Sequence, residues 1–200
     1  MSTGENPERA KYLWDQQDAL LDRCELSARY HGKRERFLGG VERLLQAVTA
    51  IAATSAFADI AGKTSDWGRW FALLAAVASI LPLVLGLSER ARLHGQLKAQ
   101  FKSILADMYV VGVEWTEEQL SAFKGRVAKA ESDEPASLAA LVIHCQNEIA
   151  VTRHQKFYPL KWWEVALMHF YGFNGARIVA RGPRESAPLS AQPRPPVAPS

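Results

Sequence analysis

Residues 70–87, WFALLAAVASILPLVLGL, contain no charged side chain. As a helix with a rise of about 1.5 Å per residue, this stretch would be about 27 Å long, close to the hydrocarbon thickness of a bilayer. It is apolar around its whole circumference, and a small soluble protein can bury such a helix only by surrounding it with partners. We therefore predict a transmembrane helix over residues 70–87, with the buried centre of a soluble bundle as the alternative.

The two ends of this stretch carry the chemistry of a membrane interface. Aromatic and charged side chains stand at its start, and an acidic and two basic residues follow its end: Trp67, Arg69 and Trp70, then Glu89, Arg90 and Arg92. Tryptophan and arginine prefer the boundary between hydrocarbon and water. These flanks support the predicted span.

Residues 44–60, LLQAVTAIAATSAFADI, form a second and weaker apolar stretch. Four polar side chains dilute its apolar character, and an aspartate marks its far end: Gln46, Thr49, Thr54 and Ser55, then Asp59. Paired with the stronger helix across a short external turn at residues 61–69, it would form a transmembrane helical hairpin. Small residues four positions apart would let the two backbones approach closely. They are Ala50, Thr54 and Ala58 in the first helix, and Ala72 and Ala76 with the offset pair Ala75 and Ser79 in the second.

Basic residues on the flanks predict the orientation of this hairpin. They are frequent before and after the two helices (Arg29, Lys33, Arg34, Arg36, Arg43, Arg90, Arg92, Lys98, Lys102), whereas the turn holds Lys63 and Arg69. The positive-inside rule then places both termini in the cytoplasm. The polar N-terminal residues show no pattern of a cleavable signal peptide, so the membrane segment is expected to be internal.

The remainder of the chain predicts an all-α protein. After a flexible N-terminus at residues 1–9, apolar residues at helical spacing predict a cytosolic helix over residues 10–43, with Gly39 and Gly40 as a break. The second membrane helix is expected to continue into a cytosolic helical region at residues 88–173, in which Thr116 and Gln119 form a capping box. Residues 174–200 are rich in proline and are expected to be a disordered tail.

No sequence motif predicts catalysis, a cofactor or a metal site. The stretch AGKTS at residues 61–65 fails as a phosphate-binding loop, because the motif requires a glycine at the position of Phe57. His144 and Glu148 share a helix face but lack the further ligands that zinc needs. Cys24 and Cys145 suggest no disulfide framework. His31 and His94 are expected to be solvated. The net charge is only +3, and the excess of basic residues is confined to the segments that flank the apolar region. This composition is not that of a nucleic-acid-binding protein.

Two features of the membrane helices favour a functional hypothesis. Gln46, Thr49 and Ala53 lie within about 60° of one another on a helical wheel and form a face of small and polar residues. This face either lines water in an oligomer or forms the tight helix contact inside the hairpin, and the contact is the favoured interpretation. Pro82 lies in the middle of the second span, where proline kinks a helix and can act as a hinge or as a static bend.

An aromatic segment near the C-terminal end has two interpretations. Trp162, Trp163, Phe170 and Tyr171 accompany Lys161 in the sequence LKWWEVALMHFYGF. Tryptophan beside lysine suits an anchor lying on the inner membrane surface. The favoured interpretation packs the segment as the last helix of the cytosolic bundle.

The order of these parts resembles the SLATT family, the two-transmembrane effectors associated with SMODS and SLOG proteins. The resemblance covers about residues 10–173 and is carried by ARYHGKRERF before the weak helix, GLSERARLHGQLKAQF after the strong one, and PLKWWEVALMHFYGF. It implies a small bacterial membrane protein of a conflict system such as anti-phage defence. In such systems a nucleotide-derived signal triggers membrane disruption by an oligomeric pore. A sensor domain is not recognisable here, which implies a nucleotide-signalling or sensor protein as partner.

Together these observations predict a non-enzymatic inner-membrane effector that oligomerises with its own copies and permeabilises the lipid bilayer when a signal or partner triggers it. The alternative is a non-conducting membrane adaptor whose cytosolic helical bundle recruits a partner protein. A soluble enzyme with a buried hairpin is a third interpretation. No nucleic-acid partner is expected.

Overall fold

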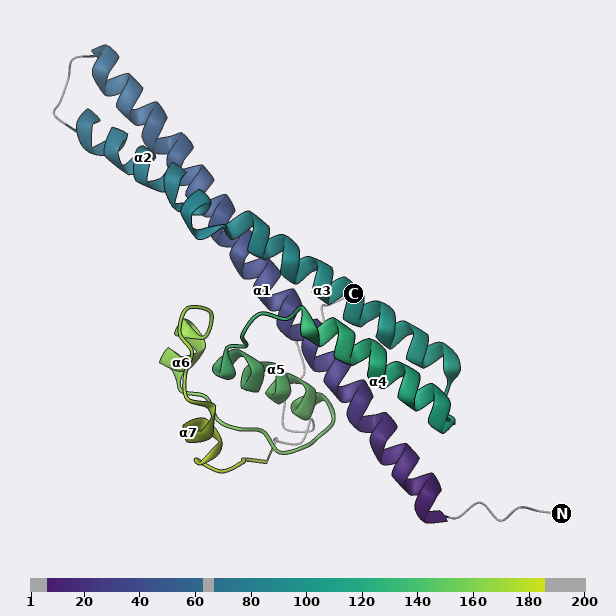
Figure 1. Cartoon of the computed structure of the whole chain (residues 1–200). Coiled ribbons are helices and arrows are strands. Elements are labelled where there is room, and N and C mark those ends of the chain that lie inside the picture. Colours follow the sequence, from purple (N-terminus) through teal and green to yellow (C-terminus); the bar gives the residue numbers. More distant parts are fainter. Residues whose placement is uncertain (1–6, 63–66, 186–200) are drawn as a thin grey trace, which may run out of the picture. The chain divides into compact units, whose positions relative to one another are not determined.

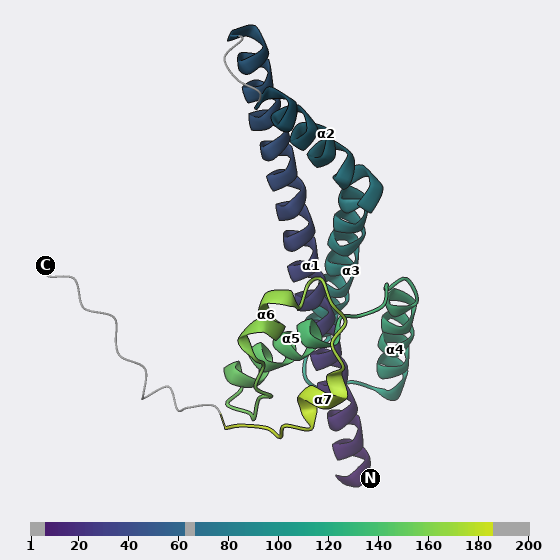
Figure 2. The ribbon, with the colours of Figure 1, turned by 90° about the vertical axis from the view of Figure 1, so that its left-hand side faces the viewer.

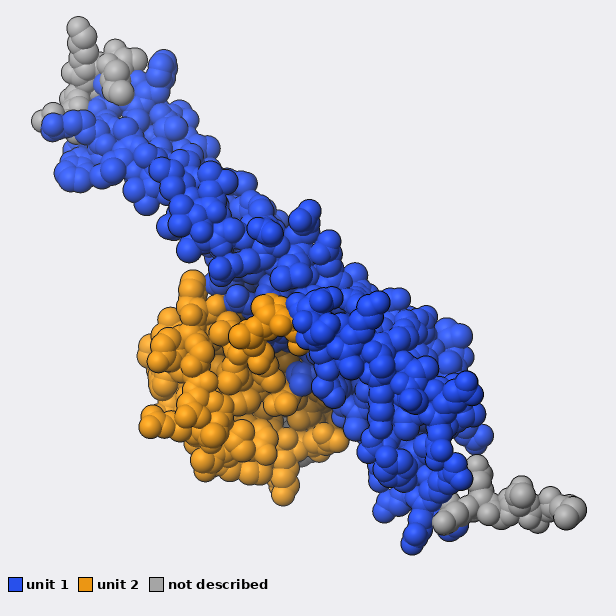
Figure 3. All heavy atoms as spheres, viewed as in Figure 1, with its two compact units in different colours: residues 1–133 blue, residues 134–200 orange. Residues whose placement is uncertain are grey.

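The computed structural model describes residues 7–62 and 67–185. Over these residues the chain is helical and has no strand, apart from an isolated antiparallel bridge between Phe157 and Arg184. The prediction of an all-α fold is therefore confirmed. The helices are α1 (Pro7–Gly62), α2 (Gly68–Leu85), α3 (Leu87–Val111), α4 (Glu117–Ser132), α5 (Ala139–Thr152), α6 (Trp162–Leu167) and α7 (Gly175–Val179). The chain divides into two compact units, Met1–Asp133 and Glu134–Ser200 (Figure 3).

Helix α1 is continuous over 56 residues, or about 84 Å. It joins the segment predicted as a cytosolic helix with the weaker apolar stretch, and it passes through Gly39 and Gly40 without the predicted break. A glycine in a helix interior costs about 1 kcal/mol relative to alanine. Packing of α1 against α3 over this region offsets that cost.

Helix α2 runs beside the C-terminal part of α1 (Figures 1 and 2). Near the turn, the backbone N–H of Gly68 donates a hydrogen bond of 2.6 Å to Oδ2 of Asp59. A Cβ atom at Gly68 would lie 2.6 Å from the same oxygen, so this contact requires glycine. The bond ties the end of α1 to the start of α2.

The second apolar helix ends earlier than predicted. Gly86 adopts the left-handed conformation, with φ 58° and ψ 40°, and its N–H donates to the carbonyl of Leu83 at 3.2 Å. Helix α3 begins at the next residue, and the ribbon changes direction between α2 and α3 (Figure 2). The expectation of one helix running from the apolar stretch into the following segment is therefore wrong, because a left-handed glycine ends α2.

Helices α1, α3 and α4 share the core of the first unit. Helix α3 lies antiparallel to α1, and Nζ of Lys98 donates a hydrogen bond of 2.5 Å to Oε2 of Glu35 on α1. The core residues recur at the helical spacing expected from the sequence: Leu20, Cys24, Ala28, Phe101, Ile104, Met108, Trp115, Leu120, Phe123, Val127 and Ala130. Phe101 and Val127 are among the most deeply buried of them.

The capping box that begins α4 is confirmed. The hydroxyl of Thr116 accepts a hydrogen bond from the backbone N–H of Gln119 at 3.2 Å, and the side chain of Gln119 accepts one from the N–H of Thr116 at 2.9 Å. Two backbone donors at the helix start are thereby satisfied.

The second unit packs α5, α6 and α7 around a small core. Ala140, Ile143 and Ile178 are buried there, and Tyr158, Leu160, Met168 and Phe173 pack against them. Arg181 pairs with the buried carboxylate of Glu164, which also accepts the N–H of Lys161 at 2.8 Å. The Arg181 hydrogen bond is the main reason why the pKa of Glu164 lies below its ordinary value of 4.5, and burial opposes it. This ion pair ties α6 to the chain that follows α7.

The predicted boundaries in this unit need two corrections. Helix α5 begins at Ala139 rather than directly after Pro135. The tail predicted to be disordered from residue 174 onward contains α7 and the bridge from Arg184 to Phe157. Ile178 explains the difference, because its side chain is buried in the core of the unit. Residues 186–200 lie outside the described part of the chain.

Candidate functional site in the apolar helix pair

Helix α2 carries a large exposed apolar surface. In the described part of the chain it is the one helix that is long and apolar enough to cross a membrane, and only 11% of it is buried. Leu83 and Val84 are 81% and 74% exposed. The core helix of a soluble protein would be mostly enclosed by its own chain. This chain does not enclose α2, and its surface indicates membrane association.

The neighbouring part of α1 does not reach the same level of apolarity, so the two-span hairpin is not confirmed. Two of its hydroxyl side chains are nevertheless satisfied within the helix. Oγ1 of Thr49 donates to the carbonyl of Leu45 at 2.9 Å, and Oγ1 of Thr54 donates to the carbonyl of Ala50 at 2.8 Å. An unsatisfied polar group in hydrocarbon costs several kcal/mol, and these bonds remove that cost.

Small residues form the contact between α1 and α2, but on a different face from the predicted one. Ala52 and Ala56 of α1 and Ala78 of α2 are buried. The predicted contact residues Ala50, Thr54 and Ala58 are exposed, as are Ala72 and Ala76. A shift of two positions turns a helix by about 200° and moves the contact to the opposite face. Small residues four positions apart occur on both faces of α1, Ala52 and Ala56 on one and Ala50, Thr54 and Ala58 on the other, so spacing alone does not select one.

The face defined by Gln46, Thr49 and Ala53 is therefore not the contact inside the helix pair. Gln46 and Ala53 are exposed, and Thr49 is half-buried. Nε2 of Gln46 donates a hydrogen bond of 3.4 Å to Oε1 of Glu42, one turn earlier on the same helix. The favoured interpretation of this face as an internal helix contact is wrong. The exposed face remains available to water or to a second chain.

The two ends of the helix pair differ in chemistry. Trp67 and Trp70 are 66% and 64% exposed beside the turn, together with exposed Arg69. At the opposite end Glu89, Arg90 and Arg92 are exposed on the first turns of α3.

The predicted hinge at Pro82 lies inside α2 and is half-buried. The helix itself ends four residues later at Gly86, where the backbone becomes left-handed. Proline leaves the carbonyl four residues earlier without its helical donor. The break next to Pro82 therefore belongs to the same short region as the predicted hinge, and its motion remains a prediction.

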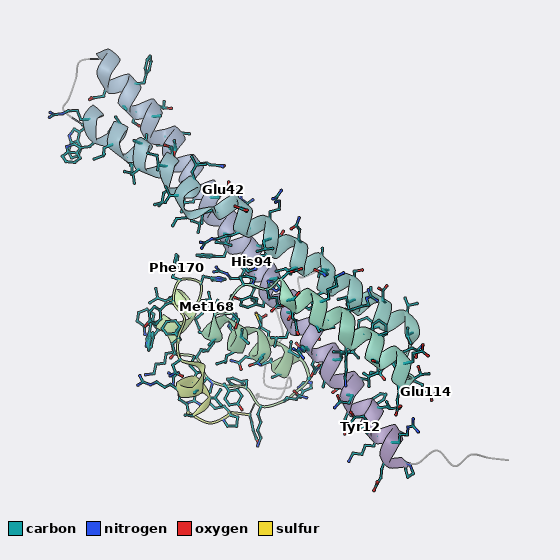
Figure 4. The ribbon with its side chains drawn as sticks, in the orientation of Figure 1. Tyr12, Glu42, His94, Glu114, Met168 and Phe170 are labelled. Carbon is teal, nitrogen blue, oxygen red and sulfur yellow. The ribbon has the colours of Figure 1, made fainter. Side chains whose placement is uncertain are left out.

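A pair of buried histidines joins α1 to α3, which the sequence analysis missed. His31 and His94 are 0% and 4% exposed, so the expectation that they are solvated is wrong. Their Nδ1 atoms lie 2.8 Å apart, and the ring of Phe101 stacks on His31 with centroids 5.9 Å apart (Figure 4). A bond between two imidazole nitrogens requires that one donates and the other accepts. The residues are distant in sequence, so only the antiparallel packing of α1 and α3 reveals them.

The remaining polar candidates do not form a reactive centre. The described residues contain no group of three histidine, cysteine or acidic side chains that could hold a metal, and Nε2 of His144 lies 3.4 Å from Oε1 of Glu148. Cys24 and Cys145 are buried free thiols. Burial, with the nearby charge of Glu131, raises the pKa of Cys24 to about 11, which suppresses its nucleophilic thiolate. Residues 63–65 of the AGKTS stretch lie outside the described residues.

The C-terminal aromatic segment divides between packing and exposure. The ring of Trp163 is half-buried, 5.4 Å from the ring of Phe173, with Nζ of Lys161 5.7 Å from its centre. Trp162, Phe170 and Tyr171 are exposed. The segment contains α6 but is not the last helix, because α7 follows it.

Comparison with known proteins adds no assignment: no family model, curated protein or solved structure matches this chain. The functional argument rests on the geometry of the helix pair.

Proposed function

We propose that this protein is a bacterial inner-membrane effector whose α1–α2 pair crosses the bilayer twice, with both termini in the cytoplasm. Copies of the chain associate through the face formed by Gln46, Thr49 and Ala53 and permeabilise the membrane. The resemblance to the SLATT family supports a place in a defence or conflict system. The protein has no enzymatic role in this proposal, and a nucleotide-signalling or sensor protein triggers it.

One observation carries this proposal: two residues of this face of α1, Gln46 and Ala53, are exposed beside the α1–α2 contact, while Thr49 is half-buried. The helix pair packs through Ala52, Ala56 and Ala78, which leaves Gln46 and Ala53 exposed. A polar face in hydrocarbon is unfavourable unless it meets another protein surface or water. Association of several copies satisfies both conditions, because it removes the face from lipid and surrounds a polar path.

The experiment measures membrane potential with a voltage-sensitive dye in bacteria that express the chain from an inducible promoter. We expect the wild type to depolarise the cells and Ala53→Leu to abolish this effect, because leucine fills the proposed path. Ala47→Leu is the matched control: Ala47 is exposed on the same helix but about 100° away from Gln46. Membrane fractionation and cross-linking verify that all three proteins insert and assemble equally.

Depolarisation by Ala53→Leu at the wild-type level would overturn the pore-face assignment. If Gln46→Leu also leaves depolarisation unchanged, the face has no role in conduction. Absence of depolarisation from inserted wild-type protein, even with its genomic neighbours co-expressed, would contradict permeabilisation itself.

The exposed aromatic side chains of the second unit favour a second candidate, a non-conducting adaptor. Trp162, Phe170 and Tyr171 are 81%, 69% and 63% exposed, and exposed aromatic residues are enriched in protein interfaces. In this case Trp162→Ala abolishes the cellular phenotype while Ala53→Leu preserves it. The effector proposal predicts that Ala53→Leu removes the phenotype.

A further inference from the structure

Four arginines next to the apolar helix pair have no acidic partner. Arg36 and Arg43 of α1 and Arg90 and Arg92 of α3 are exposed, and over the described residues none of them pairs with a carboxylate. Arginines elsewhere in the same unit behave differently. Arg9, Arg23, Arg29 and Arg126 pair with Glu117, Glu131, Glu25 and Asp107. Among the described arginines of this unit, these four without an acidic partner lie beside the proposed membrane segment.

These arginines lie at the depth of lipid headgroups if the helix pair spans the bilayer. Oγ of Ser88 on α3 donates to Glu42 on α1, which is labelled in Figure 4. Glu42 directly precedes Arg43, and Ser88 lies two residues before Arg90, so the two arginines lie at a similar level. Arg43 directly precedes the apolar stretch, and Arg90 follows the end of α2 by about 8 Å along the helix. The interfacial layer of each leaflet is about 5–8 Å thick. Arg36 lies about two turns further out than Arg43, and Arg92 about half a turn further out than Arg90, so both are within about a Debye length of that layer.

Two of these side chains are held in position by the helix. Nε of Arg36 donates to the carbonyl of Gly32 at 3.2 Å, and Nε of Arg43 donates to the carbonyl of Gly39 at 3.1 Å. The two arginines are seven residues apart and therefore share one face of α1. Anchoring through Nε leaves the terminal amino groups directed outward, where a guanidinium binds phosphate oxygens.

Acidic neighbours do not neutralise this region. Glu35 is bound to Lys98, and Glu42 accepts hydrogen bonds from Ser88 and Gln46. Arg34 adds a further cation that is half-buried near Arg90. Burial, and to a smaller extent the charge of Arg90, lowers the pKa of Arg34. Glu42 and Glu89 stand beside Arg43 and Arg90 in the sequence, but they are fewer than the four exposed arginines, so the region keeps an excess of positive charge.

We propose that Arg36, Arg43, Arg90 and Arg92 form a collar that binds the phosphate groups of anionic phospholipids in the inner leaflet. The proposal rests on the proposed function, because it requires the helix pair to lie in a bilayer. A basic cluster directly beside a membrane segment attracts anionic lipids, each basic residue contributing about fivefold in affinity. The collar selects the lipid composition around the protein and fixes its depth.

The test uses the full-length chain in vesicles of phosphatidylcholine and phosphatidylglycerol, with a trace of a photoactivatable analogue of either lipid. The measured quantity is the ratio of cross-linking by the phosphatidylglycerol probe to cross-linking by the phosphatidylcholine probe. We expect the wild type to favour the anionic probe and Arg43→Gln/Arg90→Gln to lower the ratio at least about fivefold. Arg9→Gln/Arg126→Gln removes the same charge at remote ion pairs and is expected to keep the wild-type ratio.

Equal ratios in the two double variants, or no preference in the wild type, would overturn the collar. Loss of the preference upon addition of millimolar inorganic phosphate would instead identify a site for a soluble anion and also overturn it. Carbonate extraction of the membranes distinguishes failure of the collar from failure of the proposed function, because it tests membrane insertion by itself. Release of the wild type contradicts membrane insertion, whereas retention without lipid preference contradicts only the collar.

Discussion

At the scale of single residues, the unit formed by α1, α3 and α4 is fixed by buried polar contacts that few sequence patterns reveal. The Nδ1 atoms of His31 and His94 meet at 2.8 Å between rings of Tyr30 and Phe101. The ring of Tyr30 contacts both histidines edge-on. Such a contact sets the register of two helices, because each ring has one matching position on the other helix.

We predict that His94→Leu lowers the free energy of unfolding by about 1–3 kcal/mol. Leucine keeps the site filled but removes one side of the hydrogen bond from a buried nitrogen of His31. The double variant His31→Leu/His94→Leu is expected to recover part of this loss, since neither nitrogen then remains. Denaturation of the detergent-solubilised chain measures both, with Gln96→Leu on the exposed side of α3 as control. An additive double variant would contradict the coupling.

Glu164 predicts a pH dependence of the second unit. The pKa of Glu164 lies below 4.5 in the folded chain, so its ion pair with Arg181 stabilises the second unit at pH values above 4.5. This stabilisation is lost as the pH falls through the pKa that Glu164 has in the folded chain. We expect amide hydrogen exchange in α6 and α7 to accelerate between about pH 6 and about pH 3, after correction for intrinsic exchange. Glu164→Gln is expected to exchange faster at the higher pH and to change less with pH. Glu185→Gln, at an exposed ion pair, serves as control, and identical pH profiles in all three proteins would refute the prediction.

At the scale of elements, the junction of α2 and α3 depends on one glycine. Gly86 has φ 58°, where a residue with a Cβ atom is strained, although no atom lies within 4 Å of that position. We predict that Gly86→Ala destabilises the chain by about 1 kcal/mol. Gly125→Ala is the matched control, because Gly125 also has open space but ordinary helical geometry in α4, and we expect it to stabilise by about 0.5–1 kcal/mol. Thermal melting distinguishes the two, and equal effects would contradict a strained junction.

Sequence periodicity predicted the elements of the first unit well, because its core residues recur every three or four positions. The capping box at Thr116 was readable because it depends on residues three apart. The effect of the glycines on helix continuity could not be predicted from the sequence. Gly39 and Gly40 remain helical within α1, whereas Gly86 ends α2, and the residue type alone does not distinguish these outcomes.

Only those parts of the candidate site that depend on composition could be predicted from the sequence. The apolar stretch and its tryptophan and arginine flanks follow from composition. The face of α1 that contacts α2 does not follow from it, since small residues recur every four positions on two faces. Ala52 and Ala56 were found only from the structure. The histidine pair needed the antiparallel register of α1 and α3.

At the scale of the molecule, the exposed surface of α2 is the feature that any account of function must explain. A chain that leaves α2 only 11% buried places that surface in lipid or against other proteins. The unpaired arginines at one end of the helix pair and the tryptophans at the other indicate two different interfaces. Together they support a segment that crosses the bilayer and returns.

The most direct test of this account is the accessibility of the turn between α1 and α2. Ser65→Cys in spheroplasts is expected to react with a membrane-impermeant maleimide from outside. Ser132→Cys, at the exposed end of α4, is expected to react only after lysis. The native cysteines are buried and give little background. Labelling of residue 65 from outside would support two crossings with both termini in the cytoplasm, whereas labelling of both positions only after lysis would contradict the account.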